Sequence, residues 1–563
     1  MIRTEKKFCR WHIGLLIISL IAIIPKVLIG IDNDEAYIVT MGIRLLNGDR
    51  IFSEMWELHM TSAWPAYLGL LLFKTLTGTL EGCVIFLRVL SVLAQYLVAY
   101  LTFHIIDKYE SRTTAVLAGV FVANFLPRAT QNLEYGLLEM LFVLVAVLVL
   151  YDEVMLRQNG KKGNDVKIVM AGISYALGVL AYPTIIISFP VLLIALFLLI
   201  DKQNGRLKLP MVFALTCGIC GIVFLCYVFS YLTPTDFVAN LQGILADGTH
   251  SDTLKTQTYL IQLWDMGKRT AMMFGVSFVM WLAYRKWEKD KTLMWYGMLL
   301  AGSMIFIGFN ITGLRPCGAI GLQVRYVIVA VIGIFFAIRQ KNKPVIGLFF
   351  LPGVAIYVGA MIGSNMGFEE NASFLYLAIL ATIIFMSKDA EANSIKYAKA
   401  VRVCVISFLV GIIFGKGYLV RVTGTFPANI LENRNRIADG VLAGIHVYDT
   451  EEKTYGNKMQ EIRDYSNNAD CVLYLGNNAI CNTFTEGEFT SATCISTPVY
   501  NEEWVMYYEQ DTVKQPTVVF LDKDIIETIE EFEGTEFGEY LLDKWNITKT
   551  DFIETEEFFV GRR

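Results

Sequence analysis

The sequence predicts an α-helical polytopic membrane protein that ends in a smaller α/β domain. Of its 563 residues, 55% are hydrophobic and only 18% are charged, whereas soluble domains carry about 25% charged residues. Apolar runs long enough to cross a bilayer recur over residues 1–420. Residues 421–563 are different, because they hold 12 Lys and Arg against 27 Asp and Glu, a net charge of −15, while the remainder carries +10.

This asymmetry predicts two domains. We expect a membrane domain over residues 1–420 and an acidic α/β domain over residues 421–563. An acidic soluble domain argues against nucleic acid as a partner, since the phosphate backbone attracts basic surfaces. The composition also excludes an ordinary cytosolic enzyme and a disordered chain.

Basic loops set the expected topology, because Lys and Arg concentrate on the cytoplasmic side of membrane proteins. The clearest basic segments are 153–167, 201–209, 285–291 and 339–343, and two crossings fit between each consecutive pair. We therefore expect a multi-pass protein of the cell membrane, with its N-terminus in the cytoplasm and its C-terminal domain outside the cell.

The apolar segment 63–78 does not fit this scheme as a span. It is shorter than the roughly 20 residues that a crossing needs, and it contains Pro65 and Lys74. We expect it to form an interfacial or re-entrant helix on the outer side. About thirteen spans remain, at 13–31, 84–106, 113–127, 135–152, 168–182, 184–200, 210–232, 269–285, 292–309, 324–339, 344–363, 373–386 and 401–420.

The C-terminal region has the pattern of an α/β domain. Apolar runs at 471–475 and 517–521 are typical of buried strands, and helix-like segments follow at 452–467 and 525–542. Its cysteines are Cys471, Cys481 and Cys494. A bridge between the last two and free buried thiols are both open alternatives.

The expected outer loop 32–83 begins with three carboxylates. Asp32, Asp34 and Glu35 directly follow the first apolar stretch, and residues 36–46 then carry apolar side chains at helical spacing. This pattern predicts a short amphipathic helix that lies along the membrane. Capping of that helix is the simple explanation of the acidic residues, but a cap needs one carboxylate, so the cluster is also a candidate catalytic site.

Other ionisable residues stand at the expected outer rim of the membrane. Glu139 lies just inside the fourth span, where an ionisable group is costly and often functional; the alternative is a side chain that reaches the interface or pairs with an Arg. Arg88 and Arg325 begin other spans, and an Arg there suits a phosphate. The alternative for each is snorkelling toward lipid headgroups.

No metal-binding motif is convincing in this sequence. Asp32-Asn33-Asp34 is a short Asp-x-Asp match, and no outer loop contains a paired His or Cys motif. We expect no certain cofactor. A divalent metal ion remains an open alternative, with Asp34 and Glu139 as its candidate ligands.

Several motifs resemble class C glycosyltransferases, in particular the branch of lipid A aminoarabinose transferases and protein O-mannosyltransferases, which has many bacterial relatives. These motifs lie in order within residues 10–420, and the expected span count and outer domain are similar too. They are Asp34-Glu35-Ala36-Tyr37, Leu45-Leu46-Asn47-Gly48-Asp49, His59 to Pro65, Phe86 to Ser91 with Arg88, Tyr135 to Glu139, and Arg325-Tyr326. The chain departs from the family at Glu139, where Asp is usual, and at Tyr182-Pro183, where a Lys is common.

The resemblance implies a hexosyl or pentosyl transfer from a polyprenyl-phosphate sugar in the lipid bilayer, with inversion at the anomeric carbon. The acceptor would be a glycan, lipid or protein of the cell envelope. Asp34 is the implied base, assisted by Glu35 and Glu139. Arg325, Arg88 and Tyr326 are implied for the donor phosphate, and Asp32, Tyr37 and His59 for the acceptor and its loop. Segment 63–78 would form the floor of the lipid entrance, and segment 233–268 would act as a lid over the donor.

Three other classes are open. A flippase or transporter would need ionisable residues deep in several spans and usually an internal repeat, and the sequence offers few of the former and no evident repeat. A polymerase or ligase of lipid-linked glycans should carry its large loop late in the chain. A sensor would leave the early acidic loop unexplained.

Overall fold

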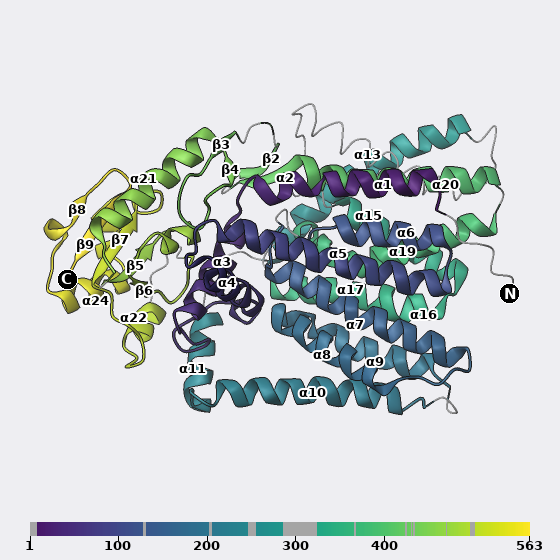
Figure 1. The fold of residues 1–563 in the computed structure, drawn as a ribbon, viewed down its shortest axis with the longest axis horizontal. Helices are drawn as coiled ribbons and strands as arrows, with labels where there is room; N and C mark the ends of the chain where they lie inside the picture. The colour runs from purple at the N-terminus through teal and green to yellow at the C-terminus, as the bar shows by residue number, and fades with distance from the viewer. Residues whose placement is uncertain are drawn as a thin grey trace.

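The structure, a computed structural model, is a long helical bundle with a mixed α/β domain at one end (Figure 1). It describes residues 8–127, 131–201, 205–245, 255–284, 324–364, 367–393, 395–422, 425–429, 431, 434–468, 470–495 and 502–563. Six helical segments of the described residues are long and apolar enough to cross a membrane, which indicates a membrane protein. They are Arg10–Leu28, Cys83–Tyr109, Lys208–Val228, Lys343–Gly363, Asn371–Ala392 and Tyr397–Tyr418.

Most predicted spans coincide with a helix. The bundle helices are α1 (Arg10–Ile21), α2 (Ile23–Leu28), α5 (Cys83–Tyr109), α6 (Arg112–Asn124), α7 (Tyr135–Gln158), α8 (Asp165–Ala181), α9 (Ser188–Leu199), α10 (Lys208–Val228), α13 (Lys255–Tyr284), α15 (Val324–Gln340), α16 (Lys343–Val345), α17 (Leu351–Gly363), α18 (Gly367–Glu370), α19 (Tyr376–Ala392) and α20 (Ile395–Tyr418). The predicted span 292–309 lies outside the described residues. The count of thirteen stays a prediction.

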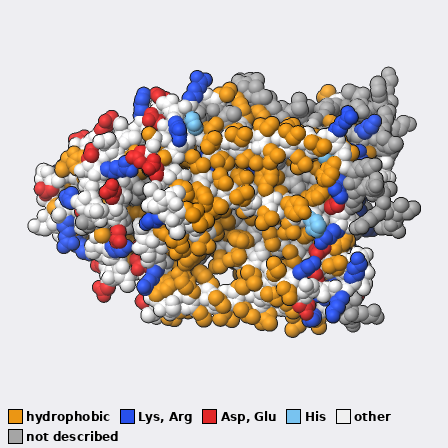
Figure 2. All heavy atoms as spheres, viewed as in Figure 1, with side chains coloured by type: hydrophobic (Ala, Val, Ile, Leu, Met, Phe, Trp, Pro, Cys, Tyr) orange, Lys and Arg blue, Asp and Glu red, His pale blue; other side chains and the backbone are white. Residues whose placement is uncertain are grey.

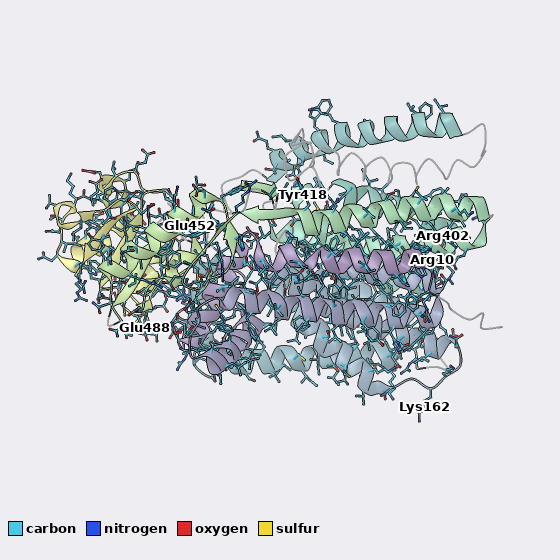
Figure 3. The ribbon with its side chains drawn as sticks, turned by 45° about the horizontal axis from the view of Figure 1, so that its top comes forward. Arg10, Lys162, Arg402, Tyr418, Glu452 and Glu488 are labelled. Carbon is cyan, nitrogen blue, oxygen red and sulfur yellow. The ribbon has the colours of Figure 1, made fainter. Side chains whose placement is uncertain are left out.

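The middle of the bundle surface is apolar, and its two ends are charged. Figure 2 shows hydrophobic side chains across the middle of this face, with charged side chains gathered toward both ends. Arg10, Lys162 and Arg402 lie at the end away from the C-terminal domain (Figure 3). The predicted placement of the basic loops on the cytoplasmic side stays a prediction. We call the opposite end, where α20 leads into the C-terminal domain, the domain end.

The C-terminal domain is built on a five-stranded mixed sheet of order β6-β5-β7-β9-β8. Strands β6 (Glu488–Phe489), β5 (Cys471–Leu475) and β7 (Val518–Asp522) are parallel, and β9 (Phe558–Arg562) and β8 (Ile553–Glu554) complete the sheet in antiparallel pairs. Two short hairpins precede it, β1 (Leu419–Val422) with β2 (Thr425–Asn429) and β3 (Asn435–Arg436) with β4 (His446–Val447). Its helices are α21 (Asp449–Tyr465), α22 (Glu502–Tyr508), α23 (Ile529–Glu533) and α24 (Glu536–Trp545).

The cysteine alternatives are resolved in favour of thiols. Cys471, Cys481 and Cys494 are all free, and the last two are buried. Burial in an apolar core is the usual environment of a free cysteine, so the 481–494 bridge does not form.

The first predicted outer loop forms two helices at the junction between bundle and domain (Figure 1). They are α3 (Asn33–Leu46) and α4 (Trp64–Thr77). Residues Glu35 to Leu45 of α3 are all buried, so α3 is not an open amphipathic helix on a membrane surface. The C-terminal domain covers its polar side. In contrast, α4 exposes apolar side chains such as Leu68 and Leu76, as an interfacial helix would.

The predicted lid segment 233–268 is partly helical. It contains α11 (Pro234–Leu245) and the beginning of α13, while residues 246–254 lie outside the described part of the chain. The helix α11 packs on the first outer loop, because a Cβ placed at Gly243 would clash with the ring of Trp56. The lid role stays a prediction.

Candidate active site

Glu35 is held in a buried ion pair at the beginning of α3. Its Oε1 accepts a hydrogen bond from Arg88 Nε at 2.7 Å, and its Oε2 accepts one from Arg88 Nη2 at 2.5 Å. Asn132 Nδ2 donates a third bond to Oε1 at 2.8 Å. Glu35 is fully buried and Arg88 is 2% exposed. This bidentate geometry neutralises the carboxylate and fixes its direction.

Arg88 also terminates the first membrane helix. Its Nη2 donates to the carbonyl of Gly30 at 2.6 Å, and its Nη1 donates to that of Val27 at 3.2 Å. Carbonyls at a helix C-terminus lack intrahelical partners and attract a cation. Arg88 therefore ties α2, α3 and α5 together. Its predicted role at the donor phosphate is not tested by these contacts and stays a prediction.

The other two carboxylates of the acidic cluster differ in exposure. Asp32 occupies the N-cap position of α3 and is 3% exposed. Asp34 lies in the first turn and is partly exposed. The positive end of the helix dipole favours the ionised form of a carboxylate in this turn. Of the three, Asp34 is the side chain most accessible from outside.

Glu139 is completely buried near the N-terminus of α7, at the domain end. Its Oε1 accepts a hydrogen bond from the hydroxyl of Tyr376 on α19 at 2.7 Å. Its Oε2 has no hydrogen-bond partner among the described residues. A buried carboxylate oxygen without a partner is costly, which makes this position a candidate for contact with a substrate hydroxyl. The predicted pairing of Glu139 with an Arg is not among the interactions that the structure describes for it.

An aromatic stack lies beside this carboxylate. The ring of His59 stacks on Tyr135, with centroids 3.9 Å apart, and on Tyr182, with centroids 5.2 Å apart. Phe374 continues the stack against Tyr182 at 4.7 Å. Tyr135 is one helical turn before Glu139, so the two share a face of α7. The structure thus brings the predicted loop residue His59 close to the second acidic position.

Arg325 and Tyr326 lie at the beginning of α15. Arg325 Nη2 donates to the hydroxyl of Tyr326 at 2.9 Å, and its guanidinium lies 4.8 Å from that ring. Tyr326 is buried against Phe125, with ring centroids 5.1 Å apart, while Arg325 is partly exposed. An Arg held by a neighbouring ring at the rim is prepared to bind an anion.

Tyr37 lies on α3 between the acidic cluster and Thr40, which binds the C-terminal domain. Burial, and after it the charge of the Glu57 carboxylate, raises the pKa of Tyr37 well above its ordinary value. Tyr37 therefore stays protonated. Sequence reasoning missed Glu57, Asn132 and Tyr376. Asn132 stands close to Glu139 in the sequence, but Tyr376 is 237 residues from it and gave no signal.

No family model and no curated protein sequence matches the chain. Three solved structures of the oligosaccharyltransferase AglB from the archaeon Archaeoglobus fulgidus are similar in fold. The crystal structure with Zn and sulfate has a TM-score of 0.48 at 13% identity and covers 94% of this chain and 70% of that chain. The complex with an inhibitory peptide and a dolichol-phosphate has 0.47 at 12%, covering 94% and 71%. The apo form has 0.49 at 11%, covering 95% and 72%. These values describe a loose likeness.

The candidate metal site does not gain support from its surroundings. Within the ranges that the structure describes, no three His, Cys, Asp or Glu side chains gather so that they could hold a metal ion. The metal role of Asp34 and Glu139 stays an open prediction. The site offers an accessible carboxylate, a buried carboxylate and a rim arginine.

Proposed function

We propose that the chain is a membrane glycosyltransferase. It transfers a sugar from a polyprenyl-phosphate donor to a cell-envelope acceptor on the side of the membrane that carries the C-terminal domain. Support comes from the ordered motifs that resemble class C glycosyltransferases, from the apolar bundle that can hold a lipid-linked donor, and from the carboxylates at the domain end.

The observation that carries the proposal is that the three carboxylates of the acidic cluster differ in their partners and their exposure. Glu35 is neutralised by Arg88, and Asp32 is buried at the helix cap. Asp34 is partly exposed in the first turn of α3. A general base must be ionised and within reach of the acceptor proton. We assign this role to Asp34 because it is the partly exposed member of the cluster.

We propose the following transfer. Asp34 takes the proton of the acceptor hydroxyl, and the acceptor oxygen attacks the anomeric carbon from the face opposite the phosphate. The bond between that carbon and the phosphate oxygen breaks, and its electron pair stays on the polyprenyl phosphate. Arg325 stabilises the charge that develops on the leaving phosphate. Glu139 accepts hydrogen bonds from sugar hydroxyls through its second oxygen.

Sugar transfer by the purified protein in detergent tests this proposal, with a panel of radiolabelled polyprenyl-phosphate sugars. The wild type should consume one donor and form a glycosylated acceptor of inverted configuration. Asp34→Asn should lower turnover by about 100-fold or more, the scale of general base catalysis. The matched control is Glu81→Gln, an exposed carboxylate of the same loop, which should keep wild-type turnover. Full transfer by a folded Asp34→Asn protein would refute the base assignment.

A flippase of lipid-linked sugars is the second candidate, and a buried cation favours it. Lys416 on α20 is 3% exposed, and its ammonium donates to the carbonyl of Ala123 at 2.7 Å and lies 3.4 Å from Gln95 Oε1. Ionisable groups inside a bundle often line transport paths. Lipid-linked sugars that cross proteoliposomes without donor consumption would select this function.

A further inference from the structure

The chain that leads into α7 is buried without being helical. Residues 131–134 are all buried, and α7 begins directly after them. Irregular backbone inside a membrane bundle is tolerated only where it is buried in protein or lines a cavity, so that its polar atoms find partners. We call these four residues the 131–134 segment, and we expect its position to depend on the side chains that bind it.

This segment links the two acidic positions of the candidate site. Asn132 Nδ2 donates to Glu35 Oε1 on α3 at 2.8 Å. At the other end of the segment, Glu134 caps α7, because its two carboxylate oxygens each accept from a backbone amide of the first turn at 2.6 Å. Glu139 lies in the next turn of α7. A shift of the segment would therefore change the separation between the acidic cluster of α3 and Glu139.

Gln131 anchors the segment to α5. Its Nε2 donates to Ser91 Oγ at 3.1 Å and to Gln95 Oε1 at 3.1 Å. Ser91 and Gln95 are both completely buried and lie one turn apart on α5. Hydrogen bonds in such an interior are made without competition from bulk water. Gln131 therefore fixes the segment to the bundle.

Gln95 is itself held by the end of α6. Its Nε2 donates to the carbonyl of Val122 at 2.8 Å and to that of Phe125 at 2.7 Å. Carbonyls at the C-terminal end of a helix lack intrahelical partners, so these bonds satisfy the helix end and fix the direction of the Gln95 amide. Its oxygen is then left to accept from Gln131.

Lys416 on α20 completes this buried network. Its ammonium donates to the carbonyl of Ala123 at 2.7 Å and lies 3.4 Å from Gln95 Oε1. A cation at the C-terminal end of a helix is favoured by the helix dipole. Polar contacts therefore run from α20 through Gln95 and Gln131 to the segment that binds Glu35.

We propose that Gln131 is a positioning residue of the sugar transfer. Through the buried network it holds the 131–134 segment, and the segment holds the acidic cluster of α3 at a fixed separation from Glu139. The transfer needs Asp34 at the acceptor hydroxyl while Glu139 binds the sugar, so this inference rests on the proposed function. Displacing one carboxylate relative to the other by about 1 Å is enough to lower the rate by up to about 100-fold.

The experiment compares Gln131→Met with Asn124→Leu in the assay with radiolabelled polyprenyl-phosphate sugars. Asn124 is the matched control, because it is a buried amide at the end of α6 whose Nδ2 donates to Ser19 Oγ and to the carbonyl of Val120, both at 2.8 Å and away from the segment. Gln131→Met should lower kcat at least about 10-fold with KM for the donor within about threefold, whereas Asn124→Leu should keep the wild-type kcat. Lys416→Met should also lower kcat, and its double variant with Gln131→Met should equal the stronger single variant, because both substitutions act on one network.

Hydrogen–deuterium exchange without donor supplies a readout that is independent of activity. Amides of residues 132–138 should exchange at least about 10-fold faster in Gln131→Met and at the wild-type rate in Asn124→Leu. Unchanged exchange or an unchanged kcat in Gln131→Met overturns the positioning role, and so does an equal loss of kcat in Asn124→Leu. If the wild type consumes no donor, the proposed function fails, and the exchange of residues 132–138 still decides whether Gln131 holds the segment.

Discussion

Replacing Arg88 by Met should destabilise the membrane domain by about 3–5 kcal/mol, the usual cost of leaving one member of a buried ion pair alone. Arg88 makes two of the three hydrogen bonds that the structure shows to the fully buried Glu35 carboxylate. It also satisfies the carbonyls of Gly30 and Val27 at the end of the first membrane helix.

The measurement is a double-mutant cycle of Arg88→Met with Glu35→Gln, in which the free energy of unfolding of each variant is determined by reversible unfolding in detergent. The double variant removes both charges, so it should be more stable than Arg88→Met alone, with a coupling energy of roughly 2–3 kcal/mol. Asp34→Asn in the same background should leave the free energy of unfolding within about 0.5 kcal/mol, because a partly exposed side chain contributes little.

A different result would refute the structural role of Arg88, which is to hold Glu35 and the end of the first membrane helix together. If Arg88 serves the donor phosphate instead, Arg88→Met should keep the wild-type free energy of unfolding and raise KM for the polyprenyl-phosphate sugar. Additivity of the two substitutions would lead to the same conclusion, since uncoupled side chains show no interaction energy.

Three further predictions concern other contacts. Lys458→Met should destabilise the C-terminal domain by about 3–5 kcal/mol, because it removes the cationic partner of the buried Asp522 carboxylate. Burial alone would lower the pKa of Lys458, but Asp522 and Asp524 raise it above its ordinary value of 10.5. The ion pair therefore stabilises the folded state fully below pH 10.5, and this contribution is lost as pH rises through the folded pKa. Unfolding midpoints measured between about pH 8 and 12 should show the beginning of this loss. Gly42→Val should cost about 1–3 kcal/mol by overpacking, since a Cβ there would lie 2.8 Å from a methyl group of Leu70; a wild-type melting temperature would contradict this. Tyr376→Phe should cost about 1–3 kcal/mol, because its hydroxyl is the partner of a buried carboxylate, and unchanged thermal unfolding would contradict it.

Local patterns predicted much of the fold. The strand at 471–475 is found as expected, and the strand at 517–521 is shifted by one residue to Val518–Asp522. The predicted helix at 525–542 is instead two helices. Gly534 ends the first, and the side chain of Thr535 caps the second by accepting from the amide of Gly538. Such a cap competes with continuation of the helix, and an apolar pattern alone does not reveal it.

Only those site residues whose type and position are informative by themselves could be predicted from the sequence. A carboxylate cluster after an apolar run marked the beginning of α3 within the sequence. The partners of those carboxylates could not be predicted, because Arg88 is 53 residues from Glu35 and Cys494 is 437 residues from Glu57. Pairings at such separations are decided by how helices and domains pack, and several arrangements of the same charges satisfy the local pattern equally well.

The helix α3 shows why its amphipathic pattern was misleading about its surroundings. Gly42 permits close packing against α4 on one side, where a Cβ would lie 3.3 Å from the amide of Tyr67. Thr40 and Arg44 bind backbone carbonyls of the C-terminal domain on the other side. A polar face covered by another domain has the same sequence periodicity as one that faces water. The distinction matters for function, since a helix on an open surface would move with the lipid, whereas α3 is fixed between two parts of the protein and can hold Asp34 still relative to both.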